Sequence, residues 1–242
     1  MCFSASANFV ASGIIGSVGV ATLRHVDHPR ATLFAAVPML FALHQFAEAF
    51  VWLGLDGEIG RVAFHHSVFL FMLYAQGLLP FLMPLAVLLM EPAGWRRWAV
   101  AACTALGAAL CCWTTYAVVA FPSQAFVDHH SIAYRNQMTD GGWVAASYVI
   151  ATCGALLLSI HRVVRWFGIL NVVGLTVVLI VKGYAFTSVW CFYAAVLSIM
   201  LYWQFSRRHV DIEQPNSSFE SGRIGEEWQA FLRPLRKPRT SR

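Results

Sequence analysis

The sequence predicts an all-α fold, an integral membrane bundle of seven transmembrane helices with the N-terminus outside and the C-terminus inside. Only 12% of its 242 residues are charged, about half the share found in soluble domains. The mean hydropathy is +0.61. Seven stretches are also apolar over a length that can cross a bilayer, which takes about 20 residues at about 1.5 Å rise each. Much of the surface must therefore face lipid.

The seven expected spans are 8–24, 31–54, 66–90, 97–120, 142–161, 163–182 and 186–205. The first is short and rich in Gly, Ala and Ser, and the second carries polar side chains. In the third, Pro80 and Pro84 each remove a backbone donor, which predicts a kink. The last two spans form one apolar run of about 40 residues, too long for a single crossing, so we expect a tight hairpin at the sequence KGYAFTS. Small residues in the seventh span allow close helix packing.

The basic residues predict the orientation, because cytoplasmic loops carry an excess of Lys and Arg. With the C-terminus inside, the inner segments hold Arg24, Arg30, Arg96, Arg97, Arg162, Arg165, Arg207, Arg208, Arg223, Arg233, Arg236, Lys237, Arg239 and Arg242. The outer segments hold only Arg61, Arg135 and Lys182. The net charge of +5 follows from this asymmetry, so no nucleic-acid partner is expected. The sequence predicts a multi-pass protein of the bacterial inner membrane, without a cleaved signal peptide because no charged region precedes the first span.

Two regions are expected along the chain. Residues 1–206 form the seven-helix transmembrane domain, and residues 207–242 form a basic cytoplasmic tail, partly disordered. Within the tail, the sequence EEWQAFLRPLRK places apolar residues at helical spacing beside basic ones, which predicts a short helix lying on the inner leaflet.

A polar group interrupts the second span. Glu48 lies about 10 Å below the outer boundary, counted at 1.5 Å per residue, and His44 lies one helical turn deeper on the same face. Gln45 and Trp52 flank that face, and Lys182 at the outer end of the sixth span is a second candidate partner for the carboxylate. A carboxylate in hydrocarbon costs at least a few kcal/mol, so we expect Glu48 to face the bundle interior. It serves there either as a functional acid or as a clasp between helices.

A second set of candidate residues lies on the outer side and predicts a metal site. Its imidazole and carboxylate groups suit zinc or a similar divalent ion: His65, His66, Asp128, His129 and His130. The last three belong to a polar and aromatic loop, 122–143, which is long enough to fold over the outer mouth of the bundle.

Cys2 and Cys191 both fall toward the outer side, where oxidation is permitted. They can pair as a disulfide or share a metal or redox role. Two unpaired thiols are the alternative. The four cysteines within spans are expected to be small core residues.

The segments MCFSASANF, HQFAEAFVWLGL and SVWCFYAAVLS together resemble a family of small bacterial multi-pass membrane proteins. Its members begin MCFSA, carry a Gln-x-x-Glu segment ending in Val-Trp-Leu, and have Trp-Cys-Phe near the last span. The resemblance spans most of 1–206 and implies that Gln45, Glu48, Trp52, Trp190 and Cys191 match the family pattern. That family has no assigned activity, so the resemblance implies an architecture and no mechanism.

Three functions fit these observations. The first is an outward-opening polar pocket at His44, Gln45 and Glu48 that binds or moves a small cation, a proton or a polar solute. The second is a non-catalytic scaffold or assembly factor that docks through its tail. The third is a membrane-embedded, metal-dependent hydrolase acting on a lipid or another amphiphile, with Glu48 as acid or base. The sequence does not decide whether the protein is an enzyme.

Overall fold

The computed structural model describes residues 4–128, 131–181 and 186–207, and it describes no side chain at 131 or over 178–195. All of these residues lie within one compact unit, Met1–Val210. The tail beyond residue 207 lies outside the described residues, so its interfacial helix stays a prediction.

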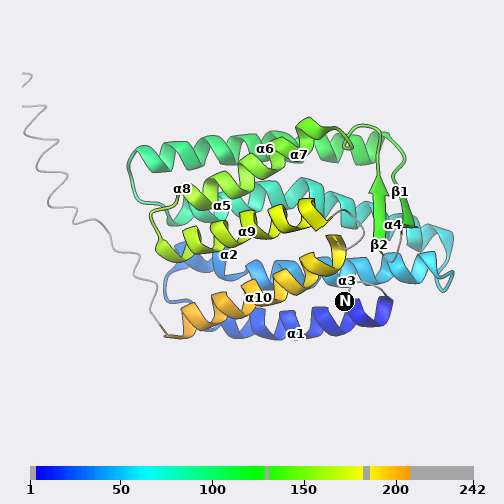
Figure 1. The fold of residues 1–242 in the computed structure, drawn as a ribbon, viewed down its shortest axis with the longest axis horizontal. Helices are drawn as coiled ribbons and strands as arrows, with labels where there is room; N and C mark the ends of the chain where they lie inside the picture. The colour runs from blue at the N-terminus through cyan, green and yellow to red at the C-terminus, as the bar shows by residue number, and fades with distance from the viewer. Residues whose placement is uncertain (1–3, 129–130, 182–185, 208–242) are drawn as a thin grey trace, which may run out of the picture. The chain divides into compact units, whose positions relative to one another are not determined.

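Helices make up most of the described chain and lie side by side, with the chain reversing at either end of the bundle (Figure 1). The elements are α1 (Ala5–Leu23), η1 (Pro29–Ala31), α2 (Thr32–Ala35), α3 (Val37–Leu55), α4 (Arg61–Met72), η2 (Leu73–Leu78), α5 (Leu79–Met90), α6 (Trp95–Ala120), β1 (Gln124–Asp128), β2 (Ser131–Arg135), α7 (Gly142–Val149), η3 (Ile150–Gly154), α8 (Ala155–Leu158), α9 (Arg162–Val181) and α10 (Phe186–Arg207). The two segments η2 and η3 are π-helical.

Among the described residues, four helical segments are long and apolar enough to cross a membrane: Ala5–Leu23, Pro29–Leu55, Arg61–Met90 and Trp95–Ala120. Gly142–Leu158 and Val196–Ser206 are apolar but shorter. The first four expected spans are thus present as helices of suitable length. The seven-span topology and its orientation stay predictions.

Exposed tryptophans mark the helix ends. Trp95 and Trp98 at the start of α6, Trp166 near the start of α9 and Trp203 near the end of α10 are exposed at one end of the bundle, and Trp143 is exposed at the opposite end (Figure 1). Tryptophan is enriched at both membrane–water interfaces. Their positions therefore fit helices that run from one interface to the other.

The first helix packs closely on the third because its small residues let the two backbones approach. The hydroxyl of Ser12 donates a hydrogen bond to the carbonyl of Ala42 over 2.8 Å. A Cβ added at Gly19 would lie 2.8 Å from the amide nitrogen of Met39. The Gly, Ala and Ser content that makes the first span weakly hydrophobic thus serves helix packing.

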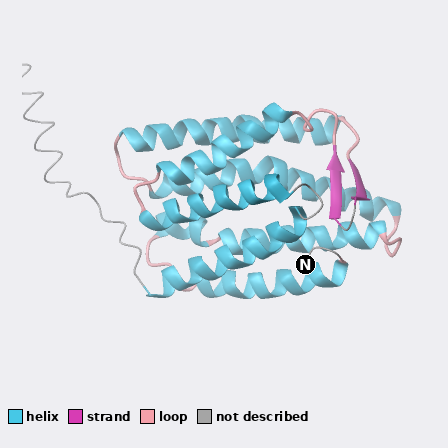
Figure 2. Ribbon diagram, viewed as in Figure 1, coloured by secondary structure: helices cyan, strands magenta, loops and turns pink. Residues whose placement is uncertain are grey.

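One correction concerns the fold class, because the expected all-α protein also contains a β hairpin (Figure 2). In loop 122–143, β1 and β2 pair antiparallel, with Gln124 opposite Arg135 and Phe126 opposite Ala133. The hairpin pairs backbone groups of a loop that would otherwise depend on water. It lies at the end of the bundle where α3 leads into α4 (Figure 1).

Candidate functional site

The polar residues of α3 face the interior of the bundle. Glu48 and Gln45 are each 1% exposed, Trp52 is 6% exposed and His44 is 8% exposed. The expectation that the intramembrane acid turns away from lipid is confirmed. The role of these residues as a site stays a prediction.

Helix α1 contributes a polar residue that the sequence analysis missed. Asn8 is fully buried. It lies on α1 between Ser12, whose hydroxyl bonds the Ala42 carbonyl of α3, and Ala5. Ala5 packs against the cluster that contains Trp52. The antiparallel register therefore places Asn8 near the depth of Glu48. Neither polar atom of its amide has a hydrogen-bond partner in the described part of the chain.

A stack of three rings closes the side of α3 that carries His44. The imidazole of His44 stacks on Phe71 of α4 with ring centroids 4.5 Å apart. Phe71 in turn stacks on Tyr134 of β2, with centroids 4.1 Å apart and an angle of 14° between the planes. Tyr74 of η2 lies against the other side of His44, at 5.7 Å, and its hydroxyl donates to the carbonyl of Leu40. The hairpin, α3 and α4 thus meet through aromatic rings.

Tyr134 reaches the site because the hairpin turns one face toward the bundle. Residues two apart on a strand share a face, and Ile132 and Tyr134 both pack against the cluster of Val51, Trp52, Phe71 and their neighbours. Burial raises the pKa of Tyr134 well above its ordinary value, and the negative charge of Glu48 raises it further. The loop therefore folds over one end of the bundle, and it buries Tyr134 where the charge of Glu48 acts on its hydroxyl. We call His44, Gln45, Glu48, Trp52 and Tyr134 the Glu48 site.

A buried asparagine fixes the hairpin to the end of α6. The side-chain amide nitrogen of Asn136 lies 3.2 Å from the Ala117 carbonyl oxygen, 3.3 Å from that of Phe121 and 3.1 Å from the Ser123 hydroxyl. Its carbonyl oxygen accepts a hydrogen bond from the amide of Met138. Asn136 therefore joins the chain on both sides of the hairpin to one helix end.

Several polar atoms in the Glu48 site have no hydrogen-bond partner among the described residues. They are Nδ1 of His44, Nε1 of Trp52 and the hydroxyl of Tyr134. Unpaired buried polar groups cost about 1–3 kcal/mol each, so these three atoms are unsatisfied within the described part of the chain.

A second acid among the described residues is fully buried, and its carboxylate is satisfied. Glu91, at the end of α5, is also 1% exposed. Its carboxylate accepts hydrogen bonds from the Ser159 hydroxyl and the Ile160 amide, both at 3.0 Å. Arg97 donates to its backbone carbonyl. The sequence analysis missed Glu91 because it lies at a span boundary, and the structure shows it as a clasp between helices.

The described members of the expected metal set do not come together. His65 and His66 are exposed on α4, where Nδ1 of His66 bonds the Val62 carbonyl oxygen 2.7 Å away, and Asp128 is exposed at the end of β1. No group of three His, Cys, Asp or Glu side chains in the described ranges is placed to hold a metal ion. His129 and His130 lie outside those ranges, so zinc binding stays a prediction.

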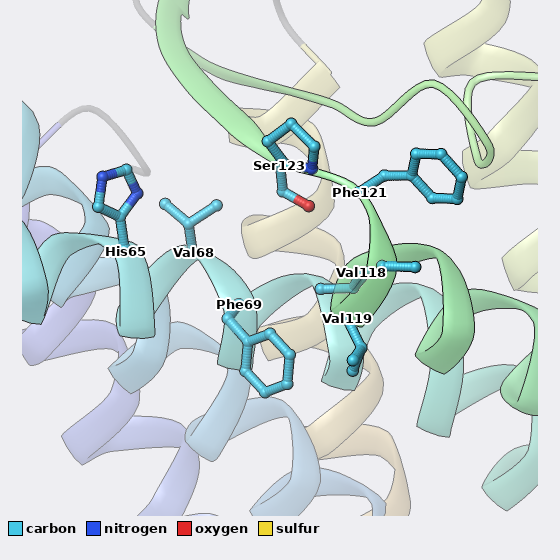
Figure 3. Close-up of a pocket in the computed structure, with 9 residues that line it drawn as sticks. His65, Val68, Phe69, Val118, Val119, Phe121 and Ser123 are labelled. Carbon is cyan, nitrogen blue, oxygen red and sulfur yellow. The ribbon is translucent and has the colours of Figure 1, made fainter.

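A pocket of about 280 Å³ lies between α4, the end of α6 and the chain leading into β1 (Figure 3). Its lining is apolar apart from His65 and Ser123. Val68 and Val118 line it and also belong to the cluster that contains Trp52 and Phe71. The pocket thus borders the same apolar cluster that packs around Trp52 and Tyr134 of the Glu48 site.

The structure does not describe the side chains of the remaining predicted residues. Lys182 and Cys2 fall outside the described residues. Cys191 belongs to α10, but its side chain is not described. A pairing of Cys2 with Cys191 and an ion pair between Lys182 and Glu48 both stay predictions. Cys103, Cys111, Cys112 and Cys153 are free thiols.

Comparison with curated proteins finds no match, and comparison with solved structures finds none either. One family model matches residues 1–216, nearly the whole chain, and it is described as a family of unknown function. This agrees with the resemblance in the sequence, which also pointed to a family without an assigned activity. The chain belongs to this family of unknown function, DUF6629.

Proposed function

We propose that this protein spans the bacterial inner membrane with seven helices, N-terminus outside, and binds or moves a small cation, a proton or a polar solute at the Glu48 site. One observation carries the proposal. Glu48 is almost fully buried, and polar atoms of His44, Trp52 and Tyr134 beside it have no hydrogen-bond partner among the described residues.

The energetics favour a ligand. An uncompensated buried charge is strongly destabilising, by several kcal/mol. A bound cation or proton neutralises the charge of Glu48, and the lone pairs of the Tyr134 oxygen and of an unprotonated His44 nitrogen can contact a cation. Glu91 shows what a purely structural buried acid looks like in the same bundle, because hydroxyl and amide donors of 159–160 satisfy it. This contrast favours a functional acid over a clasp at Glu48.

The site faces outward in the proposed topology. Glu48 lies two turns before the end of α3 at Leu55, on the side of the bundle that carries the hairpin (Figure 1). Of the described basic residues, only Arg61 and Arg135 belong to this end, which the positive-inside rule assigns to the outer face.

The experiment compares wild-type protein with Glu48→Gln in proteoliposomes. The probes are labelled sodium, labelled methylammonium and protons, the last followed with an entrapped pH dye. Asp56→Asn is the matched control, because it removes an exposed carboxylate from the end of the same helix. We expect flux or binding of at least one probe to be lost in Glu48→Gln and retained in Asp56→Asn. If Glu48→Gln folds normally and behaves as the wild type with all three probes, the proposal is wrong.

A further inference from the structure

We propose that the species handled at the Glu48 site is the proton, and that Tyr134 of the β hairpin relays it between outer water and the Glu48 carboxylate. This inference rests on the proposed function and names its ligand and one further residue. Three structural features support it: the ionisable groups around Glu48, the closed packing of the site and the environment of the Tyr134 hydroxyl.

The described groups around Glu48 suit a proton better than a metal ion. The ionisable side chains that face it are His44 on its own helix, Tyr134 on β2 and, behind His44, Tyr74 on η2. Helix α1 contributes the neutral Asn8, and α4 contributes Phe71. Calcium and magnesium take six or more oxygen ligands, and no group of three metal-ligating side chains exists in the described ranges.

The packing also favours the smallest ligand. The rings of His44, Phe71 and Tyr134 lie in contact along one side of the site, with centroid distances of 4.5 and 4.1 Å. A solute with its own volume must separate these rings to reach Glu48. A proton needs only polar atoms that waters can link, and the unpaired hydroxyl of Tyr134 and Nδ1 of His44 are such atoms.

Tyr134 is placed to be the outer member of that chain. Its hydroxyl is buried without a hydrogen-bond partner in the described structure, and it is close enough to feel the charge of Glu48. Its ring is held by Phe71, and its strand is anchored through Asn136 to the end of α6. These contacts fix the ring and leave the hydroxyl free to bond a neighbour.

The relay step conserves protons and charge. A hydronium ion on the outer side gives a proton to a lone pair of the Tyr134 oxygen. At the same time the phenol O–H bond breaks, and its proton passes to the Glu48 carboxylate through one bridging water. The phenol is restored, the carboxylate becomes a neutral carboxylic acid, and no phenolate forms. This order suits Tyr134, because its raised pKa disfavours the phenolate.

The test removes a single oxygen atom. Tyr134→Phe keeps the ring that stacks on Phe71 and loses only the hydroxyl, and Tyr116→Phe makes the same change at an exposed position on α6. Full-length protein is reconstituted into liposomes that contain a pH dye, and a potassium diffusion potential drives proton entry. We expect flux to fall at least about tenfold in Tyr134→Phe, since a positioned proton-transfer group contributes about 100-fold or more. Tyr116→Phe should match the wild type.

An infrared measurement separates a relay from a structural role. The C=O stretch of the protonated Glu48 carboxyl, identified by its loss in Glu48→Gln, should shift in Tyr134→Phe because a hydrogen-bonding neighbour is removed. The shift should appear even where thermal unfolding is unchanged.

The outcomes distinguish the two proposals. If Glu48→Gln abolishes proton flux while Tyr134→Phe leaves flux and infrared band unchanged, the relay is wrong and the proposed function stands. If labelled sodium or methylammonium moves in a Glu48-dependent way without proton flux, the proton is the wrong ligand. If no probe depends on Glu48, the proposed function fails as well.

Discussion

Replacing Asn136 should release the β hairpin from the bundle without unfolding the bundle. The Asn136 amide nitrogen faces three oxygen acceptors at 3.1–3.3 Å, and its oxygen accepts from Met138. An amide has only two N–H donors, so two donated bonds and one accepted bond are made at full strength. At about 1 kcal/mol net for each bond, Asn136→Ala should cost about 3 kcal/mol. Opening of the hairpin should then become about 100-fold more frequent, since about 1.4 kcal/mol is tenfold.

Amide hydrogen exchange in detergent or nanodiscs measures this directly. Peptides covering 124–135 should exchange much faster in Asn136→Ala, while peptides from α3 and α6 stay protected. Asn136→Asp should be at least as damaging, because it places a second carboxylate oxygen opposite the three acceptors. Its defect should weaken when acid protonates the new carboxyl and restores one donor.

A matched control is Asn171→Ala, which removes an amide whose bond to the Phe167 carbonyl lies within α9. Exchange in the hairpin should not respond to that change. Unaltered protection of 124–135 in Asn136→Ala would refute the reasoning. It would mean that the packing of Ile132 and Tyr134 holds the hairpin by itself.

Four other outcomes are expected. Glu91→Gln should lower the free energy of unfolding by about 2 kcal/mol, because hydrogen bonds to a charged group are lost, and thermal unfolding in detergent measures it. Gly107→Ala should cost about 2 kcal/mol in the same assay, because its Cβ would collide with the carbonyl oxygen of Pro80. The ordinary pKa of tyrosine is about 10. Above that pH the unfolded chain loses the Tyr134 proton, whereas the folded chain keeps it because burial raises the pKa of Tyr134. Stability should therefore fall as the pH rises, and less steeply in Tyr134→Phe. Glu58→Cys should react with an impermeant maleimide from outside intact cells, and labelling only after permeabilisation would reverse the proposed topology.

The helices were predictable because length and hydropathy depend on local sequence alone. The expected spans 31–54 and 97–120 correspond to helical segments Pro29–Leu55 and Trp95–Ala120. The third span was placed at 66–90, but its helix starts at Arg61, since helical hydrogen bonding continues past the apolar part. The inward orientation of Glu48 was predictable as well, from the cost of exposing a carboxylate to hydrocarbon.

The residues that surround Glu48 were not predictable, because they come from distant parts of the chain. Tyr134 lies in a loop whose sequence is typical of a polar connector. Only the pairing of two short strands turns the Tyr134 side chain toward the bundle. Asn8 is a single polar residue in a weakly apolar span, and its register on α3 depends on glycine contacts such as that of Gly19 with Met39. Glu91 has the same chemistry as Glu48, and only its tertiary hydrogen bonds separate a clasp from a candidate site.

The prolines of the third span illustrate a different limit. Pro80 and Pro84 predict a kink, which stays a prediction, and the structure shows a π-helical segment, η2, just before Pro80. A proline lacks the N–H that an upstream carbonyl needs, and the sequence does not show how the helix accommodates this. Here the hydroxyl of Thr114 on α6 donates to the carbonyl of Gln76. The accommodation thus depends on a neighbouring helix.

The π-helical segments also bear on the function of the polar interior. Such segments are rare and occur frequently at functional sites, and η2 borders this region. Tyr74 of η2 lies against His44. The side-chain oxygen of Gln76 is buried without a partner in the described chain. If apolar packing alone stabilised the bundle, a regular α-helix and apolar side chains at these positions would make the folded state more stable. Irregular backbone and unpaired polar atoms are instead what the proposed ligand site predicts for this region.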